Sequence, residues 1–396
     1  MRIAIVHPDL SSGKGVESYT LELARSLATE HEVHVFANRW EALPANVRLH
    51  KVWAMPGPHF LRLLTFAVNV TRQLRRQSFD LVNVQGFCAL AGDVVTVHGC
   101  YRSYWQLRRK LPARLRKWLN PFHYVALGLS DRLFTSRHTR WVIALSQGAE
   151  KDICDVYGFP PQQILVRTPG VDRDKFHPAN RVRYRHEVRA GFDLREDDFV
   201  LLFAGNEFQR KGLDLVLQAM ARISQPRLKL LVAGATHPAV QWQYRRLARK
   251  LGVQVRFAGR QRNMDRIYAA ADVFILPSRY EAFPAVVLEA AASGLPLLGS
   301  RTNGIRDVLI HDRNGWYVEL DPADIAARIT ALMDHPLQLL RVGMAARVST
   351  EDFDANRARA SLLSTYTSLA KNGLPATAPT SQECEAQQPE QPHALF

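Results

Sequence analysis

Short runs of apolar and β-branched residues alternate along the chain with longer segments whose apolar positions recur at helical spacing. At the start, apolar runs at residues 3–6 and 33–36 flank an amphipathic stretch at about 17–28. This order of strand, helix and strand predicts a parallel sheet covered by helices. Further strands are expected in the first half at 81–84, 94–97 and 142–145.

The same alternation restarts in the second half of the chain. Residues 199–204 are predicted to form a strand and residues 214–223 a helix. Further strands are expected at 228–233, 255–257, 273–276 and 295–298. A turn-rich segment at 168–178 separates the two halves. We therefore predict two open α/β domains, followed by one helix and a disordered tail. The predicted boundaries are 1–172, 173–351, 352–371 and 372–396.

The composition fits a globular protein, because 47% of the 396 residues are apolar and 22% are charged. Lys and Arg outnumber Asp and Glu by 52 to 37, so the formal net charge is +15. Such an excess indicates an anionic partner. The charge alone leaves nucleic acid, a membrane surface and a phosphorylated substrate open.

The sequence shows no pattern typical of a membrane span, a secretory leader or a cysteine-based site. No apolar run approaches the ~20 residues that a membrane span needs. The first strand begins two residues into the chain, so no secretory leader is expected. The cysteines Cys88, Cys100, Cys154 and Cys384 form no C-x-x-C pair, so neither a disulfide framework nor a thiolate zinc site is expected. The chain is accordingly predicted to be cytosolic.

The most informative stretch is Pro-Ser-Arg-Tyr-Glu-Ala-Phe-Pro at 277–284, which follows the expected strand at 273–276. Pro284 suits the first turn of a helix, where a missing N–H is harmless, and Gly294 suits its C-terminal cap. The free amides near 283–286 would then point toward the carboxyl ends of the strands. Open α/β sheets bind their ligands at this edge.

Two glutamates belong to this stretch, Glu281 just before the expected helix and Glu289 inside it. A lone helical glutamate is usually solvated, but Glu289 lies among Leu288, Ala290 and Ala291, and a carboxylate in apolar surroundings needs a partner. A glycosidase acid–base pair is disfavoured, because eight helical residues rise ~12 Å whereas hydrolases hold their carboxyl groups ~5–9.5 Å apart. The spacing favours two carboxylates that grip different hydroxyls of one extended ligand.

A second stretch, Gly-Asn-Glu-Phe-Gln-Arg-Lys-Gly at 205–212, follows the expected strand at 199–204. Arg210 and Lys211 near a helix start can hold a diphosphate through charge-assisted hydrogen bonds, each contributing ~1.5–3 kcal/mol. The alternative is that both are ordinary surface charges.

Two further features lie in the first half. The glycine loop at 11–17 half resembles a dinucleotide-binding fingerprint, but Ser18 stands where the third glycine belongs and Asn38 where an acidic residue belongs. NAD is therefore weakly supported, and a loop facing a phosphate or a second substrate stays open. His98 follows the strand at 94–97 and is predicted at the carboxyl edge of the first sheet. A lone histidine is more often structural, so a functional role rests on this location.

Taken together, these residues resemble the retaining, two-domain GT-B glycosyltransferases of family 4, and the most specific element is the E-x7-E motif of Glu281 and Glu289. Supporting elements are the Arg-Lys-Gly loop, the glycine loop at 13–17, the Pro-Gly-Val-Asp linker at 169–172, Ser146 and Asp272. The loop at 205–212 and the run at 98–118 look most like the lipopolysaccharide-core glucosyltransferases of that family. The resemblance implies two Rossmann-like parallel-sheet domains facing a cleft, with a C-terminal helix returning to the N-terminal domain.

The resemblance also implies roles, with the acceptor bound by the N-terminal domain and the nucleotide sugar by the C-terminal domain. Glu281 would hold the donor sugar and Glu289 the ribose hydroxyls. Arg210 and Lys211 would hold the diphosphate leaving group, and His98 would contact the sugar near its anomeric centre. The further donor-binding positions are Gly15, Asn206, Arg260, Phe283, Pro284, Ala285 and Val286.

In the implied mechanism the diphosphate leaves, an oxocarbenium-like sugar forms, and the acceptor hydroxyl attacks the same face while the leaving phosphate takes the proton. Many relatives carry Arg where Asn206 stands, so Arg210 and Lys211 would carry more of the charge stabilisation. No cofactor and no metal is required if these two cations neutralise the diphosphate. A D-x-D string, which suggests a divalent cation in other glycosyltransferases, occurs at 172–174 but lies in the linker.

Positive charge is concentrated at 99–130, which holds seven Lys or Arg and no Asp or Glu, with aromatic and aliphatic residues interleaved. This composition suits a helix lying in a membrane interface, where each cation near an anionic surface contributes ~1 kcal/mol. The residues expected to contact the membrane or the acceptor are Trp105, Arg108, Arg109, Lys110, Arg114, Arg116, Lys117 and Trp118. A solvated basic helix face is the alternative, and nucleic-acid binding lacks a recognition motif. The stretch at 59–76 could support the contact, although core packing is favoured for it.

The sequence therefore predicts a transferase at the cytosolic face of the membrane, peripheral to it, that moves a hexose with retention. Its partners would be a nucleotide-diphosphate sugar such as UDP-glucose, a lipid-linked or lipopolysaccharide-type saccharide acceptor, and an anionic membrane surface; no nucleic acid is expected. The alternative enzymes are a GT-B nucleotide-sugar epimerase and a phosphorylase, for which no pyridoxal-lysine signature is seen. The alternative non-enzyme is a basic membrane- or nucleic-acid-binding module, against which the E-x7-E and Arg-Lys-Gly elements argue.

Overall fold

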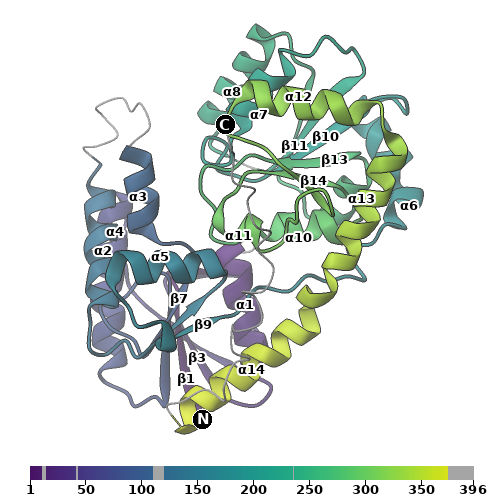
Figure 1. Cartoon of the computed structure of the whole chain (residues 1–396). Coiled ribbons are helices and arrows are strands. Elements are labelled where there is room, and N and C mark those ends of the chain that lie inside the picture. Colours follow the sequence, from purple (N-terminus) through teal and green to yellow (C-terminus); the bar gives the residue numbers. More distant parts are fainter. Residues whose placement is uncertain (11–14, 42, 110–119, 235, 373–396) are drawn as a thin grey trace, which may run out of the picture.

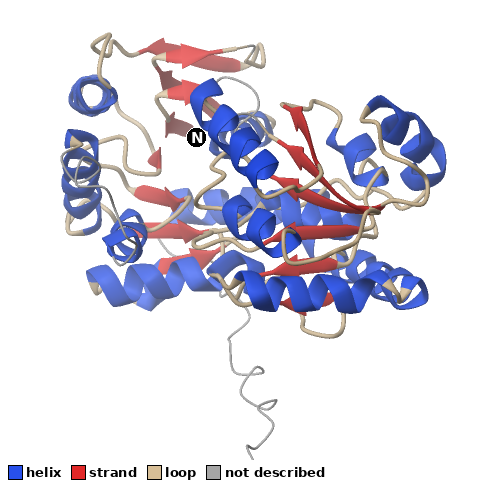
Figure 2. Ribbon diagram, turned by 90° about the horizontal axis from the view of Figure 1, so that it is seen from above, coloured by secondary structure: helices blue, strands red, loops and turns tan. Residues whose placement is uncertain are grey.

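Two parallel β-sheets, each with helices packed against it, build the chain, and Figures 1 and 2 show the two layered units beside each other. The computed structural model describes residues 1–10, 15–41, 43–109, 120–234 and 236–372. Every strand pair in the two large sheets is parallel, as the alternation of strands and helices predicts. The predicted α/β class with two Rossmann-like domains is therefore confirmed.

The first sheet has the strand order β5-β3-β1-β6-β7-β8-β9. Its strands are β1 (Arg2–Val6), β3 (Glu32–Ala37), β5 (Val47–Lys51), β6 (Leu81–Gln85), β7 (Val94–Val97), β8 (Trp141–Ala144) and β9 (Ile164–Val166). Strands β7 and β8 are buried along their whole length, which explains their continuous apolar runs. The sequence pattern misses the edge strands β5 and β9, because β5 exposes polar side chains and β9 has only three residues.

Helices and a two-stranded ribbon surround this sheet. They are α1 (Gly15–Leu27), α2 (His59–Leu74), α3 (Tyr101–Arg109), α4 (Pro121–Phe134) and α5 (Gln147–Tyr157), with β2 (Asp9–Leu10) paired to β4 (Arg39–Trp40). Ser146 is the N-cap of α5, and its hydroxyl accepts a hydrogen bond from the Ala149 amide at 3.0 Å. Helix α2 buries Phe66 and Val70 against the sheet, as the prediction of core packing for this stretch requires.

The second sheet has the order β12-β11-β10-β13-β14-β15. Its strands are β10 (Phe199–Ala204), β11 (Leu228–Ala233), β12 (Val255–Gly259), β13 (Val273–Leu276), β14 (Leu297–Gly299) and β15 (Gly315–Tyr317). The helices of this half are α6 (Asn180–Gly191), α7 (Leu213–Met220), α8 (Pro238–Lys250), α9 (Met264–Ala269), α10 (Ala285–Ala292), α11 (Asn303–Arg306), α12 (Pro322–Met333) and α13 (Pro336–Ser349). The described residues also form the 3-10 turns η2 (Pro161–Gln163), in the first half of the chain, and η3 (Glu351–Phe353).

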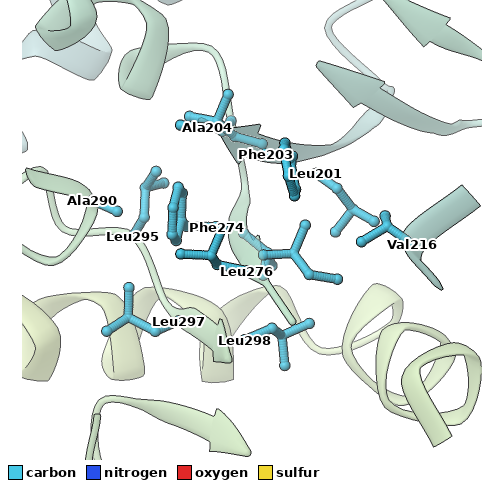
Figure 3. Packing of buried hydrophobic residues seen from close by; sticks show 14 of the residues in the cluster. Leu201, Phe203, Ala204, Val216, Phe274, Leu276, Ala290, Leu295, Leu297 and Leu298 are labelled. Carbon is cyan, nitrogen blue, oxygen red and sulfur yellow. The ribbon is translucent and has the colours of Figure 1, made fainter. Parts of the chain in front are cut away.

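The core of the second domain fixes the two central strands of its sheet. Figure 3 shows Leu201 and Phe203 of β10 beside Phe274 and Leu276 of β13, with apolar residues of the neighbouring strand and helices around them. These side chains are almost fully buried. Because the two strands run parallel and pair directly, the loops that follow them emerge at the same edge of the sheet.

A buried carboxylate anchors helix α6 to this sheet. Asp272, which precedes β13, accepts hydrogen bonds from Arg181, Arg185 and Arg189 of α6 and from the Val200 amide of β10, at 2.8 to 2.9 Å. Arg189 is itself fully buried and gives its remaining donors to backbone carbonyl oxygens. Asp272 is therefore a structural anchor rather than a part of the candidate site.

Helix α14 (Ala355–Asn372) links the two domains a second time. Figure 1 shows it, in yellow, running from the second domain along the first, close to α1. Tyr366 and Leu369 are buried in the core of the first domain. The predicted return of the C-terminal helix is confirmed. The tail expected from residue 372 onward lies outside the described residues, apart from Asn372, which ends α14.

Candidate functional site

The two loops singled out in the sequence meet at the carboxyl edge of the second sheet. The loop after β10 carries Arg210 and Lys211, and the loop after β13 carries Glu281. The Lys211 Nζ lies 2.6 Å and an Arg210 guanidinium nitrogen 3.0 Å from the same Glu281 oxygen. These three residues therefore form one charged cluster.

The charged cluster is enclosed by protein. Glu281 is only 5% exposed, and its carboxylate also accepts a hydrogen bond from the Ser278 hydroxyl at 3.3 Å. Burial alone would raise the pKa of Glu281, but Lys211 and Arg210 lower it below its usual value. The carboxylate is therefore ionised at neutral pH, and the interpretation of Arg210 and Lys211 as ordinary surface charges is wrong.

The approach of Lys211 depends on the start of its loop. The aliphatic part of Lys211 packs so closely on Gly205 that a Cβ at that position would overlap it. Gly205 also has φ +152°, outside the range that other residues prefer. Arg210 is held in addition by Glu207 at 2.6 Å and by the Tyr280 carbonyl oxygen at 2.5 Å. Both cations are thus fixed in position before any ligand binds.

Glu289 is the second carboxylate of the E-x7-E motif, and it is not one of the residues of the charged cluster. It is half-buried in α10 and accepts a hydrogen bond from the Tyr268 hydroxyl at 2.8 Å, so Tyr268 is the partner that its apolar surroundings require. Burial raises the pKa of Glu289, and the Tyr268 hydrogen bond opposes that rise. Helix α10 begins at Ala285, and Pro284 is its N-cap residue, directly before the first turn in which the sequence places it.

His98 lies at the carboxyl end of β7, where the sequence places it, and it is half-buried. Its Nε2 is 2.8 Å from the Gln85 side-chain oxygen, and its ring packs edge-on against Tyr19. Burial, with a smaller contribution from His7, lowers the pKa of His98 to about 3. His98 is therefore neutral throughout the physiological range.

The loop that carries Glu281 also touches the first domain. The Tyr280 hydroxyl accepts a hydrogen bond from the Cys100 amide at 2.7 Å and lies 3.3 Å from the Asp152 carboxylate. Asn303 donates to the same Asp152 oxygen at 2.9 Å. Sequence reasoning misses Tyr280 and Asp152, and the one available signal is that Tyr280 immediately precedes Glu281.

Helices α5 and α11 continue this contact between the domains. The Gln147 amide donates to Asp307 at 2.9 Å, and a Cβ at Gly148 would overlap Asn303. Burial raises the pKa values of Asp152 and Asp307, because both carboxylates lie between the domains. The candidate site is therefore bounded by both domains.

The other expected donor positions are spread around these loops. Asn206 and Arg260 follow β10 and β12 and are exposed, and Ala285 is exposed at the start of α10. Phe283 and Val286 are half-buried, and the Phe283 ring lies 6.3 Å from that of Phe353. Gly15 is the exposed first residue of α1, and residues 13 and 14 lie outside the described residues. Their roles stay predictions.

The basic segment of the first domain is described only at its ends. Arg102 pairs with Asp131, and Trp105 of α3 packs against the His123 ring with centroids 4.4 Å apart. Arg108 and Arg109 belong to α3, but their side chains are outside the described residues, as are the whole residues Lys110, Arg114, Arg116, Lys117 and Trp118. Among the helices that the structure describes, none has the length and apolar character needed to cross a bilayer. The predicted membrane contact stays a prediction.

The D-x-D string of the linker has a local structural role. One Asp172 oxygen accepts hydrogen bonds from the amides of Asp174 and Lys175, at 3.1 and 2.9 Å, and so closes a turn. Within the described ranges, no three His, Cys, Asp or Glu side chains are grouped as metal ligands would be. The candidate site itself offers the cations Arg210 and Lys211 to a ligand.

Two family models match the chain one after the other. The model described as Glycosyltransferase Family 4 matches residues 13–175, and the model described as Glycosyl transferases group 1 matches residues 185–349. A D-inositol 3-phosphate glycosyltransferase of Geodermatophilus obscurus is 34% identical over 58% of this chain and 53% of its own length. The chain thus spans about half the length of such curated relatives.

Solved structures share the whole architecture. WaaG, a glycosyltransferase involved in lipopolysaccharide biosynthesis, has a TM-score of 0.80 at 21% identity, over 94% of this chain and 100% of WaaG. HepE of Anabaena in complex with UDP-glucose has a TM-score of 0.71 at 18% identity, over 93% of this chain and 100% of HepE. At such identities the likeness establishes the fold. Successive glycosyltransferase family models thus match the first and the second sheet in turn, and the whole chain has the two-domain GT-B fold of these solved structures.

Proposed function

We propose that the chain is a retaining glycosyltransferase that moves a hexose from a nucleotide-diphosphate sugar to an acceptor hydroxyl. The observation that carries this proposal is the cluster of Lys211, Arg210 and Glu281 at the carboxyl ends of two paired central strands. Two fixed cations suit a diphosphate, and an ionised carboxylate beside them suits sugar hydroxyls. UDP-glucose is the first donor to test, since HepE, which shares the fold, was solved with that compound.

The chemistry rests on electrostatic stabilisation and positioning. Lys211 and Arg210 stabilise the charge that develops on the leaving diphosphate, and the amides at the start of α10 add donors beside it. The acceptor hydroxyl attacks on the face that the diphosphate leaves, and a phosphate oxygen takes its proton. Glu289, half-buried and ionisable, is proposed to accept from the ribose hydroxyls. With two cations at the diphosphate, the proposal needs no metal ion and no cofactor.

Two acceptor classes have support, and both present hydroxyls. The WaaG fold and the basic, aromatic segment at 99–130 support a lipid-linked or lipopolysaccharide-type saccharide at the cytosolic membrane face. The curated relatives at 30% to 34% identity are D-inositol 3-phosphate glycosyltransferases, which supports a phosphorylated cyclitol instead. We take the saccharide acceptor as the proposal and inositol phosphate as the second candidate.

A donor screen tests the proposal directly. UDP-, GDP- and ADP-sugars are compared by thermal unfolding, because a ligand at 100 times its Kd stabilises the folded chain by ~2.7 kcal/mol. The donor that stabilises most is then supplied with each acceptor class, and the anomeric configuration of the product is read by NMR. A transferred sugar with retained configuration supports the proposal, and stabilisation by no nucleotide sugar would overturn it. Release of an altered sugar without acceptor would instead support an epimerase.

The membrane part of the proposal has a separate test. Replacing Arg108, Arg109, Lys110, Arg114, Arg116 and Lys117 with glutamine should weaken binding to anionic vesicles, because each cation near the surface contributes ~1 kcal/mol. The control replaces four cations that are exposed on α8 of the second domain, Arg245, Arg246, Arg249 and Lys250, with glutamine and should bind vesicles as the wild type does. Equal vesicle binding by the wild type and the first variant would refute membrane contact. Stronger salt-sensitive binding to DNA than to vesicles would favour a nucleic-acid module.

A further inference from the structure

A chain of buried polar side chains connects His98 to the helix that returns from the second domain. His98 Nε2 lies 2.8 Å from the Gln85 oxygen, and the Gln85 amide nitrogen donates to the Asn83 oxygen at 2.6 Å. Asn83 donates in turn to the Tyr366 hydroxyl on α14. Gln85 is 2% exposed and Asn83 is fully buried. Side chains two positions apart on β6 share one face of the sheet, which is why these two amides can meet.

The direction of each hydrogen bond in this chain follows from the amide hydrogens. The Gln85 NH₂ group has two hydrogens, and it meets two acceptors, the Asn83 oxygen at 2.6 Å and the Thr96 hydroxyl at 3.3 Å. The opposite Gln85 orientation would turn its NH₂ group toward His98, which offers one acceptor, and would leave one buried N–H without a partner. The Gln85 oxygen therefore faces His98. A carbonyl oxygen only accepts, so the proton of the ring lies on Nε2.

The surroundings of His98 keep the ring neutral. Burial and the nearby His7 lower its pKa to about 3. The titratable groups that face it are His7, which follows β1, and Tyr19 of α1, whose ring lies 5.2 Å away. Gln85 of β6 is uncharged. With one proton fixed on Nε2, the neutral ring keeps an unprotonated Nδ1, which accepts and does not donate.

The position of His98 places this acceptor beside the contact between the domains. His98 is half-buried at the carboxyl edge of its sheet and is followed by Gly99 and Cys100, and the Cys100 amide donates to the Tyr280 hydroxyl of the opposite domain. Within the described part of the chain, its bond to Gln85 is the one hydrogen bond that the ring makes. Nδ1 is therefore available to a ligand.

We propose that Gln85 is a positioning residue, which holds His98 with its proton on Nε2 so that Nδ1 accepts a hydrogen bond from a hydroxyl of the donor sugar. The proposal deepens the proposed function and rests on it for the identity of the ligand. Specificity follows from the same geometry, because a hydroxyl can donate to Nδ1 whereas a carboxylate or phosphate oxygen cannot. His98 is thus a binding group for neutral sugars and not a proton donor in the reaction.

The position of the proton is tested without substrate. The full chain, labelled with ¹⁵N-histidine, is studied by long-range ¹H–¹⁵N NMR, and His98→Asn identifies the His98 signals. The expected result is a protonated Nε2 and an unprotonated Nδ1 in the wild type, with mixed proton positions in Gln85→Met, which lacks the accepting oxygen. Gln163→Met, the same change at an exposed site, is the control and should leave the signals unchanged. A proton on Nδ1 in the wild type, or no change in Gln85→Met, would overturn the proposal.

Sugar transfer then tests the consequence. Gln85→Met should lower kcat/KM by about tenfold, the effect of one hydrogen bond, while Gln163→Met should not. Gln85→Glu places a carboxylate against Nε2, which raises the pKa of His98. The activity of this variant should therefore fall as the pH is lowered toward 5, because His98 becomes protonated. Protonation of His98 should not lower the activity of the wild type in this range. Unchanged kcat/KM in Gln85→Met, or superimposable pH profiles, would refute the role of Gln85. Absence of transfer in the wild type together with a protonated Nε2 would refute the proposed function and leave the proton assignment standing.

Discussion

Replacing Glu281 with glutamine should move nucleotide affinity and sugar transfer in opposite directions. Glu281 is buried and holds Lys211 at 2.6 Å and Arg210 at 3.0 Å. The same two cations are proposed to bind the donor diphosphate. Carboxylate and diphosphate therefore compete for them. Removing the carboxylate charge frees both cations for UDP, but it also removes the group proposed to hold the sugar.

The size of the effect follows from the distances. At about 3 Å and an effective dielectric constant of ~20, one such pair attracts by roughly 5–6 kcal/mol before desolvation is counted. Desolvation offsets much of this, and loss of one partner of a buried pair destabilises by about 3–5 kcal/mol. We expect Glu281→Gln to lower the free energy of unfolding by ~3 kcal/mol, near the lower end of this range, because Arg210 keeps Glu207 as a partner at 2.6 Å.

Binding should respond in opposite directions to the two halves of the pair. Glu281→Gln should bind UDP about tenfold more tightly, which is ~1.4 kcal/mol, because a competing negative charge is gone. Lys211→Met should bind UDP ~10–100-fold more weakly, because one charge-assisted hydrogen bond is lost. Both variants should transfer sugar poorly.

Titration calorimetry with UDP, urea unfolding and a sugar-transfer assay measure the three quantities on the same preparations. Asp334→Asn is the matched control, since it removes a carboxylate that holds Arg227 at 2.8 Å on another side of the same domain. It should change neither UDP affinity nor transfer. Weaker UDP binding by Glu281→Gln, to the extent seen for Lys211→Met, would refute the competition. Full transfer by Glu281→Gln would refute its role in holding the sugar.

Three further predictions concern the contact between the domains and the half-buried His98. Tyr280→Phe removes the hydroxyl that the Cys100 amide bonds at 2.7 Å, so we expect about tenfold lower kcat and a larger radius of gyration by X-ray scattering. Gly148→Ala should open the domains in the same way, because its Cβ would overlap Asn303, and an unchanged scattering profile would contradict this. Burial lowers the pKa of His98 from 6.5 to about 3, so between these values the unfolded chain binds a proton that the folded chain does not. Stability is lost as the pH falls through this window, and His98→Asn should remove up to ~1.4 kcal/mol of that loss per pH unit in urea unfolding.

Much of the fold is readable from local pattern, because a buried parallel strand is apolar along its length and a covering helix is apolar on one side. Strands β7, β8, β10 and β13 are fully buried and appear as continuous apolar runs. Strand β5 lies at a sheet edge with polar, partly exposed residues, so its pattern is that of a loop. Strand β5 cannot be predicted from its apolar pattern, because it is held in the sheet by its pairing with β3 and not by burial of apolar side chains.

In the candidate site, the sequence likewise identifies some residues but not the contacts between them. Glu281 and Lys211 are recognisable because each lies in a loop that follows an apolar strand, at the edge where such sheets bind ligands. Their pairing across 70 residues depends on β10 and β13 being neighbours in the sheet. Tyr268, the partner of Glu289, lies on α9 and carries no motif of its own.

The two α/β domains, the charge at the strand ends and the motif of the two glutamates can be predicted from the amino-acid sequence, because each of these rests on residues close together in the chain. The contacts between distant residues depend on the packing of the folded chain. Cys100 and Tyr280 are 180 residues apart and Asn83 and Tyr366 are 283 apart. Such contacts depend on how two sheets and a returning helix pack in space, and hydrophobic periodicity carries no information about that packing. The proposed partner that fixes the proton of His98, Gln85, belongs to no motif in the sequence, and only the structure brings the two side chains within 2.8 Å.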